Sequence, residues 1–397
     1  MITCKEMLTP EDQVWAEGVL KKFIAKMPEV VKRNEGKMPY TTDENGRYDD
    51  RSDLTKFPKY CDGKSWWTNG FWGGLLWQMY VVTKDPLYLN AARRLEEDMD
   101  DCFREYYGLH HDVGFMWMPT AVNDYKITGN EDSLRRAHIA ANFLAGRFNP
   151  VGKFIRAWNS YWGDHNQGWA IIDCMFNISL LHYAAKEMGD PRYQEIAMMH
   201  ADTVIRNFIR ENGSSNHIVE FDPATGEKLK ELGGQGYGVG TSWTRGQAWA
   251  LYGFLISYIN TGAERYLETS CKVADYFAGC MKDKDYVPID FDQPAEPAYE
   301  DSCGGVIAAC GFLELAKVMK EQGKEEKSQQ YLAMGLKILK NIDADRTIWD
   351  QSCDAVVQNC SASYHDAKHH FTMVYADYFF LEAICKLNDT GIFTWEA

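Results

Sequence analysis

The sequence predicts an all-α protein folded as an (α/α)6 barrel, in which about twelve helices form two concentric rings. Three observations predict this fold: two kinds of helical segment alternate along the chain, the connections between them alternate in length, and strand patterns are few. Barrels often exceed the ~100–200 residues of an ordinary domain. We therefore expect residues 1–397 to form a single domain.

The first kind of segment is amphipathic, follows a tight turn and carries charge on one side. The six segments of this kind are 11–32, 86–92, 130–147, 191–208, 263–281 and 324–340. An amphipathic helix buries its apolar stripe and leaves its charged side in water. These six segments therefore form the predicted outer ring.

The second kind of segment is apolar on nearly all sides and rich in glycine and aromatic residues. The six segments of this kind are 70–84, 114–127, 168–189, 246–261, 304–319 and 371–387. A helix that is hydrophobic all round must be buried on all sides. These six segments therefore form the predicted inner ring.

Connection lengths predict where the two ends of the barrel differ. Inner helices lead to outer ones through short turns such as Lys84-Asp85-Pro86 and Gly189-Asp190-Pro191. The connections that lead into inner helices are mostly long, at 33–69, 148–167, 209–241, 282–300 and 342–369. Because consecutive helices run antiparallel, the long loops gather at one end, where function usually concentrates. We call this end the mouth.

Composition excludes several classes of protein. The net charge is −15, with 42 Lys and Arg against 57 Asp and Glu, which excludes a general binder of nucleic acid or membrane surfaces. No basic-then-apolar leader begins the sequence, and no apolar run approaches the ~18 residues of a membrane span. The 11 cysteines are scattered without a CxxC pair, which is typical of reduced thiols in a cytoplasm.

Polar and aromatic residues gather where the chain enters the inner helices. These entry segments read Trp66-Trp67-Thr68-Asn69-Gly70, His110-His111-Asp112-Val113-Gly114, Asp164-His165-Asn166-Gln167-Gly168, Trp243-Thr244-Arg245-Gly246 and Asp301-Ser302-Cys303-Gly304. Helix capping explains part of the Asp, Ser, Thr and Asn content but not the tryptophans. Indole rings beside polar groups are typical of a sugar-binding pocket.

Two aspartates are the candidate acids of this mouth. Asp173 lies in the apolar stretch 169–176, about one turn inside an inner helix, where lost hydration raises the pKa of a carboxyl toward that of a general acid. A structural ion pair is the alternative, and it is favoured for the similarly embedded Asp124 and Asp377. Asp112 has the alternative of a helix N-cap, but it could face Asp173 and divide acid and base work with it.

Other motifs carry less information. The glycine-rich stretch 233–240 resembles a phosphate loop in composition, but no strand–loop–helix unit frames it, so it is interpreted as a flexible loop beside the mouth. No HExxH or CxxC motif indicates a metal, although His110, His111 and His165 could be arranged as ligands. We expect neither a metal nor an organic cofactor.

The motifs together resemble the unsaturated glucuronyl hydrolases of glycoside hydrolase family 88. The resemblance rests on Trp67-Thr68-Asn69-Gly70-Phe71-Trp72, His111-Asp112-Val113-Gly114-Phe115, the segment 164–173, and Ser242-Trp243-Thr244-Arg245-Gly246-Gln247-Ala248-Trp249. It spans nearly the whole chain in the same order. The unsaturated rhamnogalacturonyl hydrolases share the fold and the chemistry and are the nearest alternative.

The resemblance implies a particular reaction and a set of site residues. Enzymes of this family add water across the C4–C5 double bond of the unsaturated uronic acid that polysaccharide lyases leave on glycosaminoglycan disaccharides. Asp173 matches the acid/base and Asp112 matches its partner. The positions that match substrate contacts are His111, His217, Gln235, Arg245, Trp249, Trp66, Trp67 and Trp158. Among these, Arg245 and the histidines would offer charge-assisted bonds to the uronate carboxylate.

Several alternatives stay open at the level of sequence. An inverting glycosidase on the same barrel could use the two aspartates on a saturated glycan. A sugar epimerase or isomerase could use paired histidines, such as His110-His111 and His369-His370. A non-catalytic sugar-binding protein would gain nothing from a buried acid that costs stability. The motifs also leave open whether sulfated or unsulfated disaccharides are preferred.

Overall fold

The structure is a computed structural model that describes residues 2–160 and 165–397. Its outer ring consists of α1 (Pro10–Arg33), α3 (Pro86–Asp98) with α4 (Asp100–Glu105), α7 (Glu131–Ala145), α10 (Pro191–Asn207), α12 (Glu264–Cys280) and α14 (Glu325–Asp345). Its inner ring consists of α2 (Asn69–Thr83), α5 (Val113–Trp117) with α6 (Asn123–Thr128), α8 (Cys174–Asn177) with α9 (Ser179–Met188), α11 (Thr244–Thr261), α13 (Ser302–Glu321) and α15 (Val374–Leu387).

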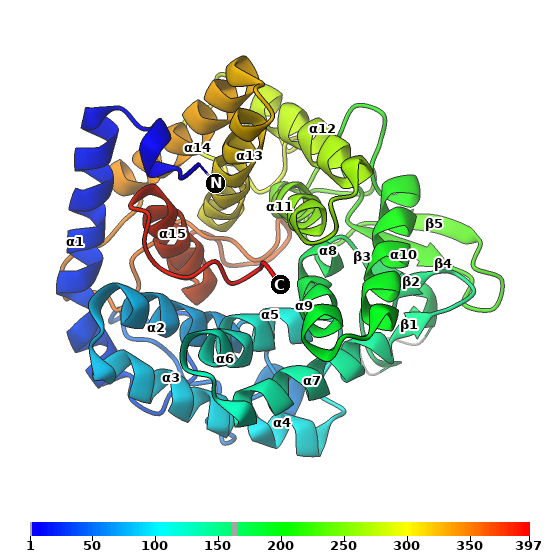
Figure 1. Ribbon diagram of the computed structural model, residues 1–397, viewed down its shortest axis with the longest axis horizontal. Coiled ribbons are helices and arrows are strands. Elements are labelled where there is room, and N and C mark those ends of the chain that lie inside the picture. Colours follow the sequence, from blue (N-terminus) through cyan, green and yellow to red (C-terminus); the bar gives the residue numbers. More distant parts are fainter. Residues whose placement is uncertain (1, 161–164) are drawn as a thin grey trace.

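Figure 1 shows the outer helices enclosing the inner ones, which confirms the predicted (α/α)6 barrel. Inner and outer helices alternate along the chain, as the hydrophobic patterns predict. Among the described residues, α13 alone is long and apolar enough to cross a membrane, and 89% of its most apolar window is buried inside the barrel. That burial is what an inner helix requires.

Local capping explains the short turns at the end opposite the mouth. Inner helices end on residues in the left-handed conformation, such as Gly129 with φ 73° and Gly189 with φ 61°. The next outer helix then begins at a side-chain cap: Asn130 accepts from the N–H of Asp132, and Asp190 from that of Arg192. A left-handed glycine ends one helix and an Asn or Asp N-cap begins the next, so the chain reverses within two or three residues.

The long loops fold into small strands at the mouth. β1 (Phe148–Asn149) pairs with β2 (Phe154–Ile155), and β3 (Trp169–Ile171), β4 (Ile218–Phe221) and β5 (Lys228–Leu232) form an antiparallel sheet in that order. The prediction that residues 168–189 are helical throughout is therefore wrong at its start. Ala170 pairs with Val219 of β4, and the helix begins only at Cys174.

The closed end of the barrel is filled by the segment that follows α15. Trp395 is fully buried there, and its ring lies 4.4 Å from that of Phe176 in an edge-to-face arrangement. Its indole N–H donates to Oε2 of Glu382 at 2.9 Å, while the Tyr252 hydroxyl donates to Oε1 at 2.6 Å. Trp395 thus packs against the inner helix that follows Asp173.

Replacing Trp395 should lower the stability of the whole barrel. Trp395→Ala removes a fully buried ring and leaves a buried oxygen of Glu382 without its donor. Such large-to-small changes cost about 3–5 kcal/mol. Urea denaturation followed by circular dichroism measures the change. Val14→Ala, at a side chain that is 71% exposed, is the control and should change the free energy by less than about 0.5 kcal/mol. Equal midpoints for the two variants would contradict the role assigned to Trp395.

Candidate active site

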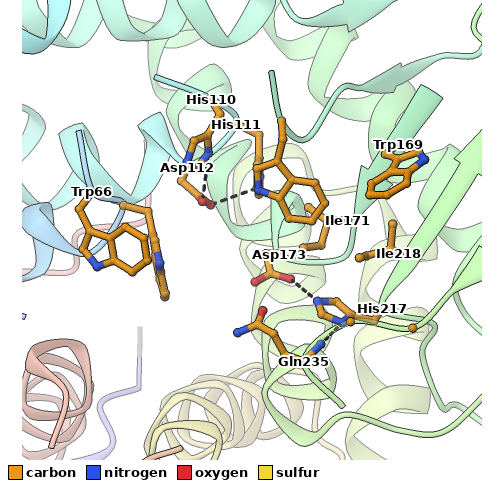
Figure 2. Close-up of a pocket in the computed structure, with 14 residues that line it drawn as sticks. Trp66, His110, His111, Asp112, Trp169, Ile171, Asp173, His217, Ile218 and Gln235 are labelled. Atoms are coloured by element: carbon orange, nitrogen blue, oxygen red, sulfur yellow. Dashed lines mark hydrogen bonds and ion pairs between the residues drawn. The ribbon is translucent and has the colours of Figure 1, made fainter. Parts of the chain in front are cut away.

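A cavity of about 460 Å³ opens at the mouth of the barrel (Figure 2). Its volume lies in the range of small-molecule sites. The residues that line it are Trp66, Trp67, His110, His111, Asp112, Trp158, Trp169, Ile171, Asp173, His217, Ile218, Gly233, Gly234 and Gln235. Long-loop residues thus meet at one end of the barrel, as the connection lengths predict.

Eight of the ten residues singled out in the sequence line this cavity. They are Asp112, Asp173, His111, His217, Gln235, Trp66, Trp67 and Trp158. His165 is exposed and does not line it, and Asp164 lies outside the described residues. Arg245 and Trp249 lie behind the cavity wall, as described below.

Asp173 lies at the junction between β3 and α8, directly before the first residue of the helix. The expected position one turn inside a helix is therefore wrong, because the preceding residues are held in β3 by pairing with β4. The expected burial holds, since only 8% of Asp173 is exposed. Burial raises the pKa of its carboxyl to about 7, against the opposing positive charge of Arg245.

His217 faces Asp173 from the residue before β4 (Figure 2). Its Nδ1 accepts the backbone N–H of Gln235 at 3.1 Å. A neutral imidazole that accepts at Nδ1 carries its proton on Nε2, and Nε2 lies 4.0 Å from Oδ2 of Asp173. Burial, together with the charge of Arg245, lowers the pKa of His217 to about 3. His217 is therefore a neutral N–H donor directed at the acid.

The glycine-rich stretch forms the wall beside His217 and is well tied, which corrects its interpretation as a flexible loop. A Cβ at Gly234 would overlap the His217 ring, so only glycine lets the backbone approach that closely. The buried carboxylate of Asp290 accepts from the N–H of Tyr237 at 2.9 Å and from the hydroxyl of Thr241 at 2.7 Å. The stretch thus serves as scaffold for Gln235.

Asp112 precedes α5 but does not cap it, so the capping alternative is wrong. Its Oδ1 accepts from Nδ2 of Asn177 at 3.1 Å and lies 3.4 Å from Nε2 of His111. Its Oδ2 lies 3.3 Å from Nδ1 of His110. Burial, and next the charge of Asp173, raise the pKa of Asp112 well above its ordinary value. Both acids therefore favour the protonated state.

His110, His111 and Asp112 could together hold a metal ion, because one ligand atom from each lies within 4.8 Å of the others. Imidazole and carboxylate are common ligands of zinc. Burial lowers the pKa of His110 to about 3, so this ring is neutral. The nearest ring nitrogens lie 3.3 and 3.4 Å from the oxygens of Asp112. The absence of a metal from the reaction remains a prediction.

Arg245 does not line the cavity, and its direct contact with a substrate carboxylate remains a prediction. Its guanidinium is fully buried and donates to Oδ2 of Asp301 at 2.9 Å. It also donates to the carbonyl oxygens of Ser361 at 2.9 Å and Ala362 at 2.6 Å. Arg245 therefore holds the loop before α15 and acts on Asp173 through its charge.

Trp249 lies in the aromatic packing beneath the cavity. Its ring is 4.8 Å from that of Phe115 and 5.1 Å from that of Phe176. Burial lowers the pKa of His111 well below its ordinary value, as it does for His217, so charge-assisted bonds to a uronate, which remain a prediction, would come from neutral rings to the charged carboxylate. These rings donate as neutral groups.

The other embedded acids have structural partners, as expected. Asp377 accepts from the N–H of Val357 at 2.7 Å and from the hydroxyl of Tyr48 at 2.6 Å. Asp124 accepts from Asn130 at 2.7 Å and from Ser133 at 2.9 Å. Neither lines the cavity.

Sequence reasoning missed two residues of the site, Trp169 and Asn177. Trp169 lines the cavity from β3. Asn177 is fully buried and bonds Asp112. The available signal for Asn177 was an amide four residues after Asp173, the spacing of one helical turn.

The state of His217 can be tested directly. We expect a neutral imidazole with its proton on Nε2 from about pH 5 to pH 8, the range in which an ordinary histidine titrates. Long-range ¹H–¹⁵N spectra of histidine-labelled protein report both the tautomer and the charge. Gly234→Ala, whose methyl group would overlap the ring, should shift the His217 resonances. A ring that titrates near pH 6.5 would contradict the assignment.

Comparison with known proteins places this chain in a family. The model of Glycosyl Hydrolase Family 88 matches residues 24–388. The unsaturated glucuronyl hydrolase of Bacillus sp. strain GL1 is 32% identical over 350 residues, which cover 84% of this chain and 91% of that protein. The unsaturated chondroitin disaccharide hydrolase of Streptococcus pneumoniae is 31% identical over 355 residues, which cover 83% of each chain.

Solved structures agree with this placement. The crystal structure of the unsaturated glucuronyl hydrolase from Bacillus sp. GL1 superposes with a TM-score of 0.85 at 28% identity, covering 92% of this chain and 96% of that one. The chain is thus a hydrolase and, as its motifs indicate, belongs to Glycosyl Hydrolase Family 88.

Proposed function

We propose that this chain, as a single catalytic domain, hydrates the C4–C5 double bond of a 4,5-unsaturated uronic acid. The substrates are the glycosaminoglycan disaccharides that polysaccharide lyases leave behind, and the products are a keto-uronic acid and the remaining sugar. The observation that carries the proposal is the buried carboxyl of Asp173, with a pKa of about 7, in a cavity walled by tryptophans and neutral histidines. The names of the relatives, an unsaturated glucuronyl hydrolase and an unsaturated chondroitin disaccharide hydrolase, support the substrate class.

The reaction needs one group that first gives and then takes a proton. Asp173, protonated by virtue of its burial, donates its proton to C4 of the double bond. Positive charge develops at C5 and the ring oxygen, and a water molecule adds at C5. The Asp173 carboxylate accepts the proton that this water loses. The resulting hemiketal opens, and the glycosidic bond breaks as the hemiacetal at C1 decomposes.

The neighbours of Asp173 have distinct roles in this scheme. His217 directs a neutral N–H at the Asp173 carboxyl and stabilises it once it is ionised. Asp112, whose pKa is raised well above its ordinary value by burial and next by the charge of Asp173, stays protonated and is a neutral neighbour of the acid. Trp66, Trp67 and Trp158 offer flat faces for the two sugar rings.

The uronate carboxylate is recognised by neutral donors in this proposal. No lysine or arginine is among the described residues that line the cavity. The rings of His111, His217 and Trp169 line it instead, and the N–H of His217 is directed at Asp173. The free cysteines fit a reducing compartment such as the cytoplasm.

An absorbance assay tests the proposed reaction. Unsaturated disaccharides derived from chondroitin, hyaluronan, heparin and rhamnogalacturonan are incubated with the enzyme, and the ultraviolet band of the conjugated double bond is followed. We expect the band to disappear with a glycosaminoglycan disaccharide. An intact band with cleaved glycosidic bonds would indicate an ordinary glycosidase. Turnover of the rhamnogalacturonan disaccharide alone would identify the chain as an unsaturated rhamnogalacturonyl hydrolase.

Asp173→Asn should abolish the loss of the double bond. The amide has nearly the shape of the carboxylic acid but cannot deliver a proton to C4, so we expect a loss of at least about 10²–10⁴-fold in kcat. Disaccharide binding, measured by calorimetry, and the far-ultraviolet circular dichroism should be nearly unchanged. Near wild-type turnover in this variant would remove Asp173 from the mechanism.

Activity should fall as the pH rises through the pKa of Asp173. The protonated acid is required for the first step, so activity is retained below about pH 7 and lost above it. His217 adds no acidic limb in this range, since its pKa is about 3. The profile of kcat/KM from pH 4.5 to 9 checks this. A midpoint near the ordinary aspartate pKa of about 4 would contradict the burial argument.

A further inference from the structure

Asn177, the last residue of α8, is a fully buried amide that bonds both aspartates without lining the cavity. Its Oδ1 accepts from the backbone N–H of Phe115 at 2.7 Å. Its Nδ2 donates to Oδ1 of Asp112 at 3.1 Å and to the carbonyl oxygen of Asp173 at 3.3 Å. One side chain therefore joins the carboxyl of Asp112 to the backbone of Asp173.

The partners of this amide fix its orientation. A backbone N–H can only donate, so the atom that faces Phe115 is the amide oxygen. The NH₂ group then faces Asp112 and the carbonyl of Asp173. Oδ1 of Asp112 accepts from this NH₂ group, while its Oδ2 faces His110.

Tight packing keeps the amide in place. A Cβ at Gly114 would overlap the carbonyl oxygen of Asn177 and lie 2.5 Å from its Cα, so the start of α5 and the end of α8 touch through their backbones. The rings of Phe115 and Phe176 pack 5.7 Å apart beside this contact. The amide has no space in which to rotate away from its partners.

We propose that Asn177 is a positioning residue that fixes the carboxyl of Asp112 relative to the backbone of Asp173. This role rests on the proposed function, because it serves the same pair of acids. Asn177 lies behind the cavity wall, so it affects the reaction only through them. Its replacement should therefore change kcat and the pH profile much more than KM.

Asn177→Asp is the sharpest test of this role. The variant keeps the size of the side chain and an oxygen for the Phe115 N–H, but it loses the donor and places a third carboxyl beside Asp112. Carboxyls in contact share protons, which raises the pKa of one of them. We expect kcat to fall about 10- to 100-fold, KM to stay nearly constant and the alkaline limb to move to higher pH.

Asn123 supplies a matched control. It is also fully buried, and its Nδ2 donates to the carbonyl oxygen four residues earlier, at Pro119, and to one further side chain, the hydroxyl of Thr394. It does not line the cavity. Asn123→Asp should lower the melting temperature about as much as Asn177→Asp does, with kcat and the pH profile unchanged.

The outcomes separate this role from the proposed function. A wild-type enzyme that leaves the double bond intact refutes the proposed function, and the role of Asn177 with it. If the wild type is active but Asn177→Asp matches Asn123→Asp in kcat and pH profile, the role of Asn177 is refuted and the proposed function stands. Where Asn177→Asp does not fold, Asn177→Ser, which removes the amide without adding charge, is judged by the same comparison of kcat with KM.

Discussion

The removal of water from the Asp173 carboxyl is the constraint on which the remainder of the site depends. Burial stabilises the neutral acid, while the charge of Arg245 stabilises the carboxylate. Burial prevails because Arg245 is already paired with Asp301, 2.9 Å away, and the field of such a pair falls off faster than that of a lone charge. The result is a pKa of about 7, at which one group can both give and take a proton.

The same ion pair also sets the shape of the cavity wall. The carbonyl oxygen of Ala362 accepts from Arg245 at 2.6 Å and from the side chain of Gln235 at 2.8 Å. The N–H of Tyr364 donates to the carbonyl of Gln235 at 2.8 Å. Gln235 is thus held from both sides, and its own N–H fixes the tautomer of His217. A continuous set of hydrogen bonds leads from a buried ion pair to the donor that faces the acid.

Sequence patterns predict the features that local physics decides. Periodicity and turn residues suffice to predict the (α/α)6 barrel and the position of its mouth. Helix type and connection length are both properties of segments of a few tens of residues. They fail at contacts between distant segments. Asp173 starts a helix because β3 pairs with residues 218–220, and Arg245 leaves the cavity because Asp301 and the 361–362 loop take its donors. Asp290 reveals its role through a long-range partner, and so does Asn177 in its bond to Asp112.

An acidic protein that binds an anionic sugar presents an apparent conflict, which the local state of the cavity resolves. The net charge of −15 belongs to the whole chain, but the histidines at the cavity are neutral and its two acids favour protonation. A uronate that enters therefore meets little negative charge. Its own charge then favours the protonated form of Asp173 further, since like charges in a desolvated site repel strongly. Binding of the substrate thus promotes the protonation state that the first step requires.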